Sequence, residues 1–141
     1  MQKIILMPII FVIFFSGFAP SHPAFAEFIL PIEVKEYQGI SYISGGIGSD
    51  ERKALLQTGK AYSLKIMFAV KGGAYLADVK VVIKNPAGKK LFEGVSEGPW
   101  MFIKLRPGKY QVSAVADGKV LNKAANVNEN GQTEIRFYWK N

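Results

Sequence analysis

Residues 61–71 read AYSLKIMFAVK, and apolar side chains in this stretch alternate with polar or smaller ones. A period of two is typical of a strand that buries one face and exposes the other. The face expected to be buried consists of Tyr62, Leu64, Ile66, Phe68 and Val70. Gly72-Gly73 follows at once and predicts a turn. This stretch is the clearest half-buried strand in the chain, and it indicates a fold built from sheets.

Similar short stretches fill the rest of the chain. Strands are expected at 79–84, 91–95, 100–105, 110–116, 119–127 and 133–140, with weaker candidates at 28–36 and 39–44. Turn residues separate them at intervals of about 8–12 residues, which is typical of a sandwich of short strands. We therefore predict an all-β fold, an antiparallel β-sandwich of about seven to nine strands with one short helix.

Specific turn types are predicted at three places. Arg106-Pro107-Gly108 has proline and glycine in the order of a type II turn, in which Gly108 needs a positive φ. Asp117-Gly118 and Asn130-Gly131 are the residue pairs that favour type I′ hairpins. Each of these two pairs is expected to join neighbouring antiparallel strands.

One helix is predicted at residues 50–58. Ser49 is a favourable N-cap residue, and Gly59 is suited to end the helix in a left-handed conformation. Leu55 and Leu56 are expected to face inward from this helix.

The N-terminal 26 residues have the pattern of a signal peptide. Lys3 precedes an almost unbroken apolar run of 16 residues, and Ala24-Phe25-Ala26 follows as an A-x-A cleavage site. The run is shorter than the ~20 residues that a membrane-spanning helix needs. We expect residues 1–26 to be removed, which gives a periplasmic or secreted protein with no membrane span.

Composition excludes several classes of enzyme from the exported chain. The 141 residues carry a net charge of +7, no cysteine and a single histidine, His22, which lies in the expected leader. A Ser-His-Asp or Cys-His nucleophile, a Cys/His zinc site and a disulfide all require the missing residue types. We therefore expect a protein that is not an enzyme, with no catalytic residues, no metal and no cofactor.

Two motifs connect the chain to a known family. Residues 105–114, LRPGKYQVSA, have the form L-x-P-G-x-Y-x-V-x-A, and the stretch ADVKVVI at 77–83 leads into NPAGK at 85–89. Together they resemble carboxypeptidase regulatory-like domains, which are prealbumin-like β-sandwiches. The resemblance implies such a sandwich at 61–141, with the N-terminal strands and short helix of 27–60 packed on it. It implies no peptidase activity, because these domains do not supply the zinc ligands of the peptidases they accompany.

The segment YISGGIGSDERKALL at 42–56 resembles a part of small uncharacterised exported bacterial proteins that pair it with such a domain. This second resemblance implies no activity.

Aromatic side chains out of phase with the expected core are the candidate contacts for a partner. The alternation in 133–140 assigns Arg136 and Tyr138 to the outer face, and Tyr75 lies just past the Gly72-Gly73 turn. Exposed rings are suited to contact a protein or to stack on sugars. Lysines are spread over the strands rather than clustered, so no nucleic-acid partner is expected.

The function predicted is that of a non-enzymatic exported module for protein binding or structural support in the periplasm or cell envelope. The alternative is a carbohydrate-binding module that uses exposed aromatic side chains. The expected partner is thus an envelope protein or a glycan.

Cleavage after Ala26 is directly testable, because signal peptidase reads the small side chains of Ala24 and Ala26. N-terminal sequencing of the exported protein should begin at Glu27. A mature protein that still carries Phe11 to Phe15 would contradict the prediction and identify a retained membrane anchor.

Overall fold

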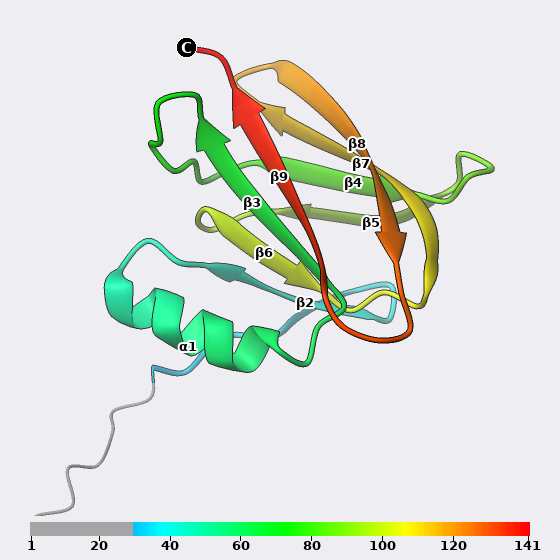
Figure 1. Ribbon diagram of the computed structural model, residues 1–141, viewed down its shortest axis with the longest axis horizontal. Coiled ribbons are helices and arrows are strands. Elements are labelled where there is room, and N and C mark those ends of the chain that lie inside the picture. Colours follow the sequence, from blue (N-terminus) through cyan, green and yellow to red (C-terminus); the bar gives the residue numbers. More distant parts are fainter. Residues whose placement is uncertain (1–29) are drawn as a thin grey trace, which may run out of the picture.

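The computed structural model describes residues 30–141, and the expected leader lies outside the described residues. The described part contains nine strands and one helix (Figure 1). Their bounds are β1 Lys35–Tyr37, β2 Ile40–Gly45, α1 Ser49–Gly59, β3 Leu64–Val70, β4 Lys80–Lys84, β5 Lys90–Val95, β6 Trp100–Ile103, β7 Gly108–Ala116, β8 Lys119–Val127 and β9 Thr133–Trp139. The all-β fold with one short helix is confirmed.

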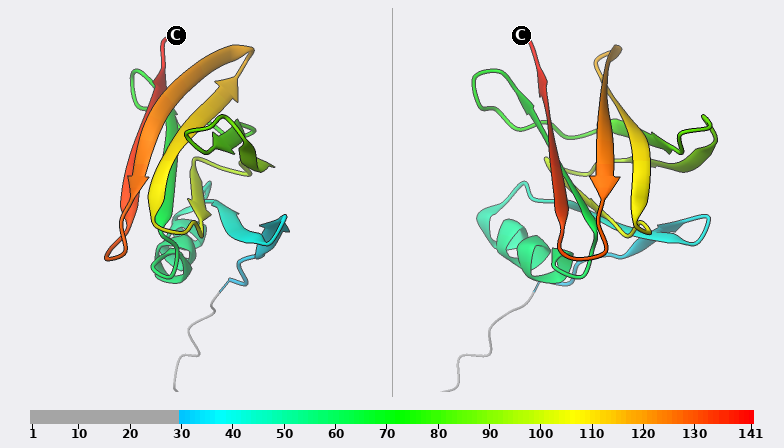
Figure 2. Two further views of the ribbon diagram at one scale, coloured as in Figure 1. Left: turned by 90° about the vertical axis from the view of Figure 1, so that its right-hand side faces the viewer. Right: turned by 45° about the vertical axis from the view of Figure 1, so that its right-hand side comes forward.

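The strands form two sheets that pack face to face (Figure 1). Sheet A has the order β1-β2-β6-β3-β9, and sheet B has the order β5-β4-β7-β8. At the side where β8 lies beside β9 (Figure 2), the Thr133 hydroxyl donates to the Asn126 carbonyl oxygen at 2.9 Å, and Trp139 Nε1 donates to the Lys119 carbonyl oxygen at 3.0 Å. These bonds tie the two sheets together along one side.

Sheet A is mixed, whereas an antiparallel arrangement was predicted throughout. β3 and β9 run parallel from the pair Leu64–Thr133 to the pair Val70–Trp139, and the other strand pairs are antiparallel. A tight turn enforces an antiparallel pair only between strands that it joins. Between β3 and β9 the chain passes through the whole of sheet B and returns, so no turn constrains their direction.

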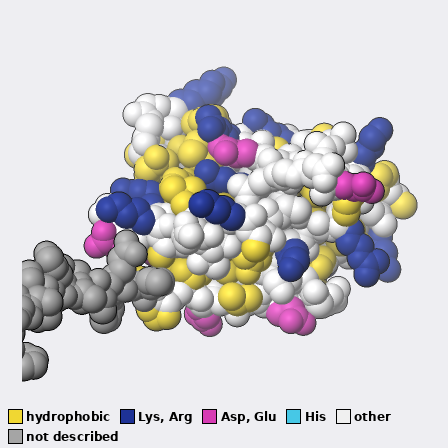
Figure 3. Space-filling view, turned by 60° about the horizontal axis from the view of Figure 1, so that its bottom comes forward, with side chains coloured by type: hydrophobic (Ala, Val, Ile, Leu, Met, Phe, Trp, Pro, Cys, Tyr) yellow, Lys and Arg dark blue, Asp and Glu magenta, His cyan; other side chains and the backbone are white. Residues whose placement is uncertain are grey.

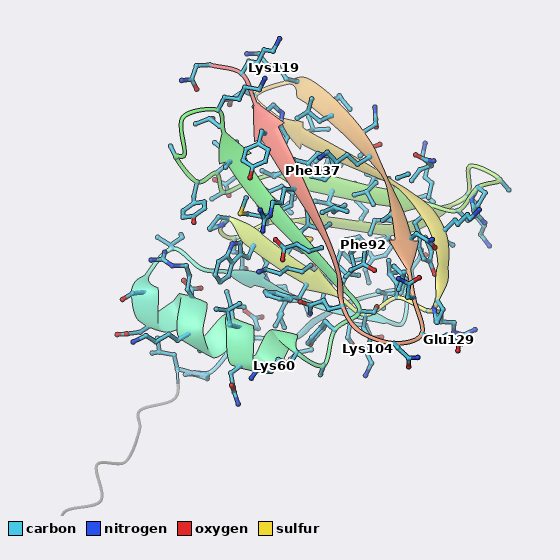
Figure 4. The ribbon with its side chains drawn as sticks, viewed as in Figure 1. Lys60, Phe92, Lys104, Lys119, Glu129 and Phe137 are labelled. Carbon is cyan, nitrogen blue, oxygen red and sulfur yellow. The ribbon has the colours of Figure 1, made fainter. Side chains whose placement is uncertain are left out.

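The main core lies between the sheets and follows the period-two pattern. Leu64, Ile66 and Phe68 of β3 are fully buried, as predicted, and Phe137 and Trp139 of β9 are buried beside them. The Phe68 ring centroid lies 6.2 Å from that of Phe137 and 6.4 Å from that of Trp139. Phe137 and Phe92 occupy the space between the sheets (Figure 4). Long-range aromatic packing therefore joins β3 to the end of the chain.

A second, smaller core lies under α1, on the outer face of sheet A. Its buried members are Ile43, Leu55, Tyr62, Trp100 and Phe102. Leu55 faces this core as predicted, but Leu56 is 43% exposed, contrary to the prediction. A helix turns about 100° per residue, so two consecutive leucines cannot both face one narrow contact.

The ends of α1 differ from the predicted ones. Gly48 occupies the N-cap position with no side-chain hydrogen bond, and Ser49 is already helical. Glu51 instead accepts a hydrogen bond from the Ile47 N–H at 3.0 Å. Gly59 is the last helical residue and has no left-handed conformation. Its lack of a side chain serves close packing, because a Cβ there would lie 2.5 Å from the Phe102 ring.

Of the two predicted type I′ hairpins, one is confirmed. Asp117 and Gly118 have φ of 48° and 72° and join β7 to β8. The prediction for Asn130-Gly131 is wrong, because that loop leads from β8 in sheet B to β9 in sheet A. A hairpin needs two strands that pair with each other, and β9 pairs with β3 instead.

The segment Arg106-Pro107-Gly108 forms a corner between sheets rather than the predicted type II turn. Gly108 has φ +157°, far from the +80° of that turn, and it is the first residue of β7. The Tyr110 hydroxyl donates a hydrogen bond of 2.6 Å back to the Arg106 carbonyl oxygen. The proline, glycine and tyrosine of this motif thus fix the point where the chain crosses from sheet A to sheet B.

Replacement of Gly108 by alanine should destabilise the fold. The φ of Gly108 lies in a region that side chains rarely adopt, although a Cβ would have room, with Tyr110 atoms no nearer than 3.6 Å. We expect Gly108→Ala to lower the free energy of unfolding by about 1–3 kcal/mol through backbone strain. Urea denaturation measures the change, with Lys109→Ala at the exposed neighbouring position as the control. Equal stability of the two variants would contradict the strain.

Candidate functional site

The three residues predicted as partner contacts lie on one face of the molecule, the outer face of sheet A. Ala69 of β3 pairs with Tyr138 of β9 on one side and forms a bridge with Tyr75 on the other. Residues directly opposite each other in neighbouring strands point to the same face of a sheet. We call Tyr75, Ala69 and Tyr138 the tyrosine row, because two rings flank one small residue.

Exposure within the tyrosine row is uneven. Tyr75 is 53% and Tyr138 is 43% exposed, while Ala69 between them is only 2% exposed. Ala69 belongs to neither the main core nor the core under α1. Two backbone bonds fix Tyr75 beside β3: the Val70 N–H donates to the Ala74 carbonyl at 2.9 Å, and the Leu76 N–H donates to the Phe68 carbonyl at 3.1 Å. The backbone at Tyr75 is thus hydrogen-bonded to β3 on both sides, and Tyr138 belongs to β9.

Charged residues occupy the same outer face next to the row. Arg136 Nε donates to Glu134 Oε1 at 2.6 Å, and Lys65 Nζ lies 3.5 Å from the other carboxylate oxygen of Glu134. Burial raises the pKa of the Glu134 carboxyl, but the hydrogen bond from Arg136 and the charge of Lys65 together lower it below its ordinary value. Glu134 therefore stays ionised and holds Arg136 two residues from Tyr138.

Lys65 also anchors this group to the core under α1. Its Nζ lies 4.7 Å from the centroid of the Trp100 ring, and its side chain is only 14% exposed. A cation over an indole face is attracted by the ring quadrupole. Lys65 thus positions Glu134 from below the surface. Arg136 reaches solvent, because its side chain is 56% exposed.

Two further cations follow the ends of the paired strands. Lys71 comes directly after β3 and Lys140 directly after β9, and both are exposed. The Lys71 N–H donates to the Trp139 carbonyl oxygen at 2.7 Å, so the two strand ends stay together. Figure 3 shows hydrophobic side chains gathered near the upper left, with lysine and arginine side chains at the border. Lys71 and Lys140 thus place two positive charges at the ends of the strands that carry Ala69 and Tyr138.

The outer face of sheet B carries a different cluster. Glu93 lies 2.9 Å from Lys80 Nζ and 2.6 Å from Lys90 Nζ. Hydrogen bonds from Lys90 and Lys80, reinforced by their charges, lower the pKa of the Glu93 carboxyl to about 2. The Lys80 and Lys90 side chains are exposed, and Glu93 between them is half-buried. This cluster has the features of a surface ion-pair group rather than of an acid–base pair.

Two hollows lie elsewhere on the sandwich. One of about 340 Å³ is lined by Pro86, Tyr110, Ala125 and their neighbours, and one of about 230 Å³ lies beside Trp139 and Asp117 at the end of the sandwich. Within residues 30–141, no group of three or more His, Cys, Asp or Glu side chains is placed to hold a metal ion. In the same described part, no helix is long and apolar enough to cross a membrane.

Sequence reasoning missed the residues that join the candidate contacts to one another. Ala69 and Lys65 are outward positions of β3, and the alternation around them was visible in the sequence. The available signal was Ala69 itself, a small residue at an outward position of a strand, where larger side chains from neighbouring strands can flank it. Which strands stand on either side of β3 had no local signal, because its partners lie far along the chain.

The comparison with known families covers the same strands. Residues 62–138 match the model of the Rhizobiales growth-associated tandem repeat domain, and no curated protein matches the chain. The match runs from just before β3 almost to the end of β9, and it includes Tyr75, Arg136 and Tyr138. It gives no carboxypeptidase regulatory-like assignment. The two-sheet architecture that the resemblance implied is present, with a different family attached to it.

The Glu93 cluster predicts a defined acid sensitivity. A carboxyl with a lowered folded-state pKa stabilises the fold above its ordinary pKa of 4.5, and this contribution is lost as the pH falls toward about 2. Thermal denaturation between pH 5 and pH 2 should therefore show a smaller loss of stability for Glu93→Gln than for the wild type. Glu129→Gln, in the loop before β9, controls for removal of a carboxyl elsewhere. Parallel curves for the wild type and Glu93→Gln would contradict the ion-pair cluster.

Proposed function

The chain belongs to the Rhizobiales growth-associated tandem repeat domain family, and we propose that it is a non-enzymatic exported module that binds a component of the cell envelope. The binding surface is the tyrosine row with Arg136 beside it. We place it in the periplasm or outside the cell as a secreted protein, which is what the leader pattern of residues 1–26 predicts.

The observation that carries the proposal is the shared register of Tyr75 and Tyr138 on either side of Ala69. Two large rings stand exposed on backbone that hydrogen bonds already fix, so binding would cost them little conformational entropy. Tyrosine and arginine are also the residue types that most often dominate binding energy at interfaces. A surface of this kind favours recognition and offers no group poised for bond cleavage.

The composition supports a non-enzymatic role. Residues 27–141 contain no histidine and no cysteine, which are frequent general bases and nucleophiles. The carboxyls with a lowered pKa, Glu93 and Glu134, are engaged with lysine or arginine in surface ion pairs. Both carboxyls thus have structural partners that account for their pKa values.

Two classes of partner fit such a module, an envelope protein that it binds or braces and a glycan. The glycan is the alternative partner, and the narrowness of the exposed strip around the tyrosine row supports it. α1 packs on the β2 and β6 part of the outer face, and β9 is the edge strand. A standard protein interface uses about 20–30 residues on each side, far more than the strip between α1 and the edge presents.

Binding to isolated cell envelopes tests the proposal. The exported protein and its double variant Tyr75→Ala/Tyr138→Ala are titrated against washed envelopes of the producing cells. Loss of two dominant rings should weaken binding by about 30-fold or more. The matched control is Val95→Ala/Val120→Ala, which removes side chains of similar exposure, 51% and 55%, from the outer face of sheet B.

Melting curves establish that both double variants are folded. Equal envelope binding by the tyrosine variant and the wild type would refute the outer face of sheet A as the binding surface.

A further inference from the structure

We propose that the tyrosine row binds an oligosaccharide that carries carboxylate groups, an inference that rests on the proposed function above. Tyr75 and Tyr138 stack on sugar rings, and Arg136, with Lys71 and Lys140 near the strand ends, pairs with the carboxylates. The spacing of the two tyrosines across β3 and the positive charge around them support this ligand.

The spacing of the two tyrosines suits a chain-like ligand. Both pair with Ala69 from opposite sides, so their backbones are two strand spacings, about 10 Å, apart. A ligand that contacts both tyrosines must therefore extend across β3. A chain of linked sugar rings that crosses β3 contacts them with successive units. Each tyrosine then supplies one apolar ring face and one hydroxyl for hydrogen bonding.

The residues between the tyrosines are small or half-buried. Ala69 is only 2% exposed, and Met67, one outward position before it along β3, packs against the core under α1. Met67 pairs with Arg136 of β9, one outward position before Tyr138. A sugar chain along the row therefore contacts the two exposed rings rather than Ala69, with a guanidinium at one side. The apolar C–H face of a pyranose and its polar rim match these two surroundings.

The charge around the row selects an anionic ligand. Glu134 is engaged by both Lys65 and Arg136, so it does not outweigh the cations on this face. Arg136 reaches solvent, and Lys71 and Lys140 add two exposed ammonium groups near the same strand ends. Guanidinium and carboxylate form strong charge-assisted hydrogen bonds. The same charge disfavours a second copy of this chain, which carries a net +7.

Titration with a defined uronic acid oligomer tests this inference. Tetragalacturonate is the probe, and the uncharged galactotetraose is its neutral counterpart. Isothermal calorimetry on the exported protein should show binding of tetragalacturonate that weakens as salt is added, with much weaker binding of galactotetraose. Tyr75→Ala or Tyr138→Ala should each weaken tetragalacturonate binding by about tenfold or more. Val120→Ala, on the outer face of sheet B, should leave it unchanged.

Two milder variants separate stacking from charge and keep the fold intact. Tyr138→Phe retains the ring and should stay within about threefold of the wild type. Arg136→Gln should weaken tetragalacturonate by about tenfold and leave galactotetraose unaffected. Equal binding of the acidic and neutral oligomers would overturn the charge selection.

Failure of the inference is distinguishable from failure of the proposed function. If neither oligomer binds while envelope binding still depends on Tyr75 and Tyr138, the saccharide ligand is refuted and the binding module stands. Loss of that envelope binding after protease treatment would then identify a protein partner. If envelope binding does not depend on the tyrosines, the proposed function itself is refuted.

Discussion

The parallel pairing of β3 with β9 is the constraint on which the rest of this structure depends. It runs over seven residue pairs, from Leu64–Thr133 to Val70–Trp139, and joins segments almost seventy residues apart in sequence. On its inner face it aligns Phe68 with Phe137 and places Trp139 within 6.4 Å of the Phe68 ring. On its outer face it aligns Ala69 with Tyr138. One register thus sets the main core and the candidate binding surface together, because side chains of a strand alternate between its two faces.

The two ends of the outer face of sheet A differ in what covers them. α1 covers Ile43, Trp100 and Phe102 at one end and forms a second core there. At the other end the tyrosine row stays uncovered. Lys65 connects the two ends, since its Nζ lies over the Trp100 ring and near the Glu134 carboxylate that holds Arg136. Close packing of α1 depends on Gly59, where a Cβ would lie 2.5 Å from the Phe102 ring.

Predictions from short sequence patterns were correct where the conformation depends on residues that are close together in the chain. Asp117-Gly118 adopts the positive φ angles of a type I′ turn because the two strands that it joins pair with each other. The period of two in β3 identified Leu64, Ile66 and Phe68 as buried, since one face of a strand must meet a core. The same reasoning failed at Asn130-Gly131, where the chain leaves sheet B after β8 and β9 pairs with β3 in sheet A. It failed at Leu56 as well, because the contact under α1 is narrower than the apolar pair 55–56 suggested.

The proposed binding surface shows the same division at a single site. Arg136 and Tyr138 were found in the sequence as side chains out of phase with the core, and Tyr75 was found by its place just past the Gly72-Gly73 turn. Their proximity was not visible there, because it comes from two pairings of Ala69, one with the following loop and one with the last strand. The lowered pKa of the Glu134 carboxyl likewise depends on Arg136 and Lys65, which only the fold brings to its two oxygens.

The sequence by itself determined the all-β class, the positions of most strands, the short helix and the face that each strong strand buries. These follow from side-chain period and from turn residues, which act over a few positions along the chain. Only the tertiary structure decided which strands are neighbours, that β3 and β9 run parallel, and that Pro107-Gly108 forms a corner between sheets. Those outcomes depend on burying two sheet faces against each other, and the free energy of that burial is shared among residues far apart in sequence.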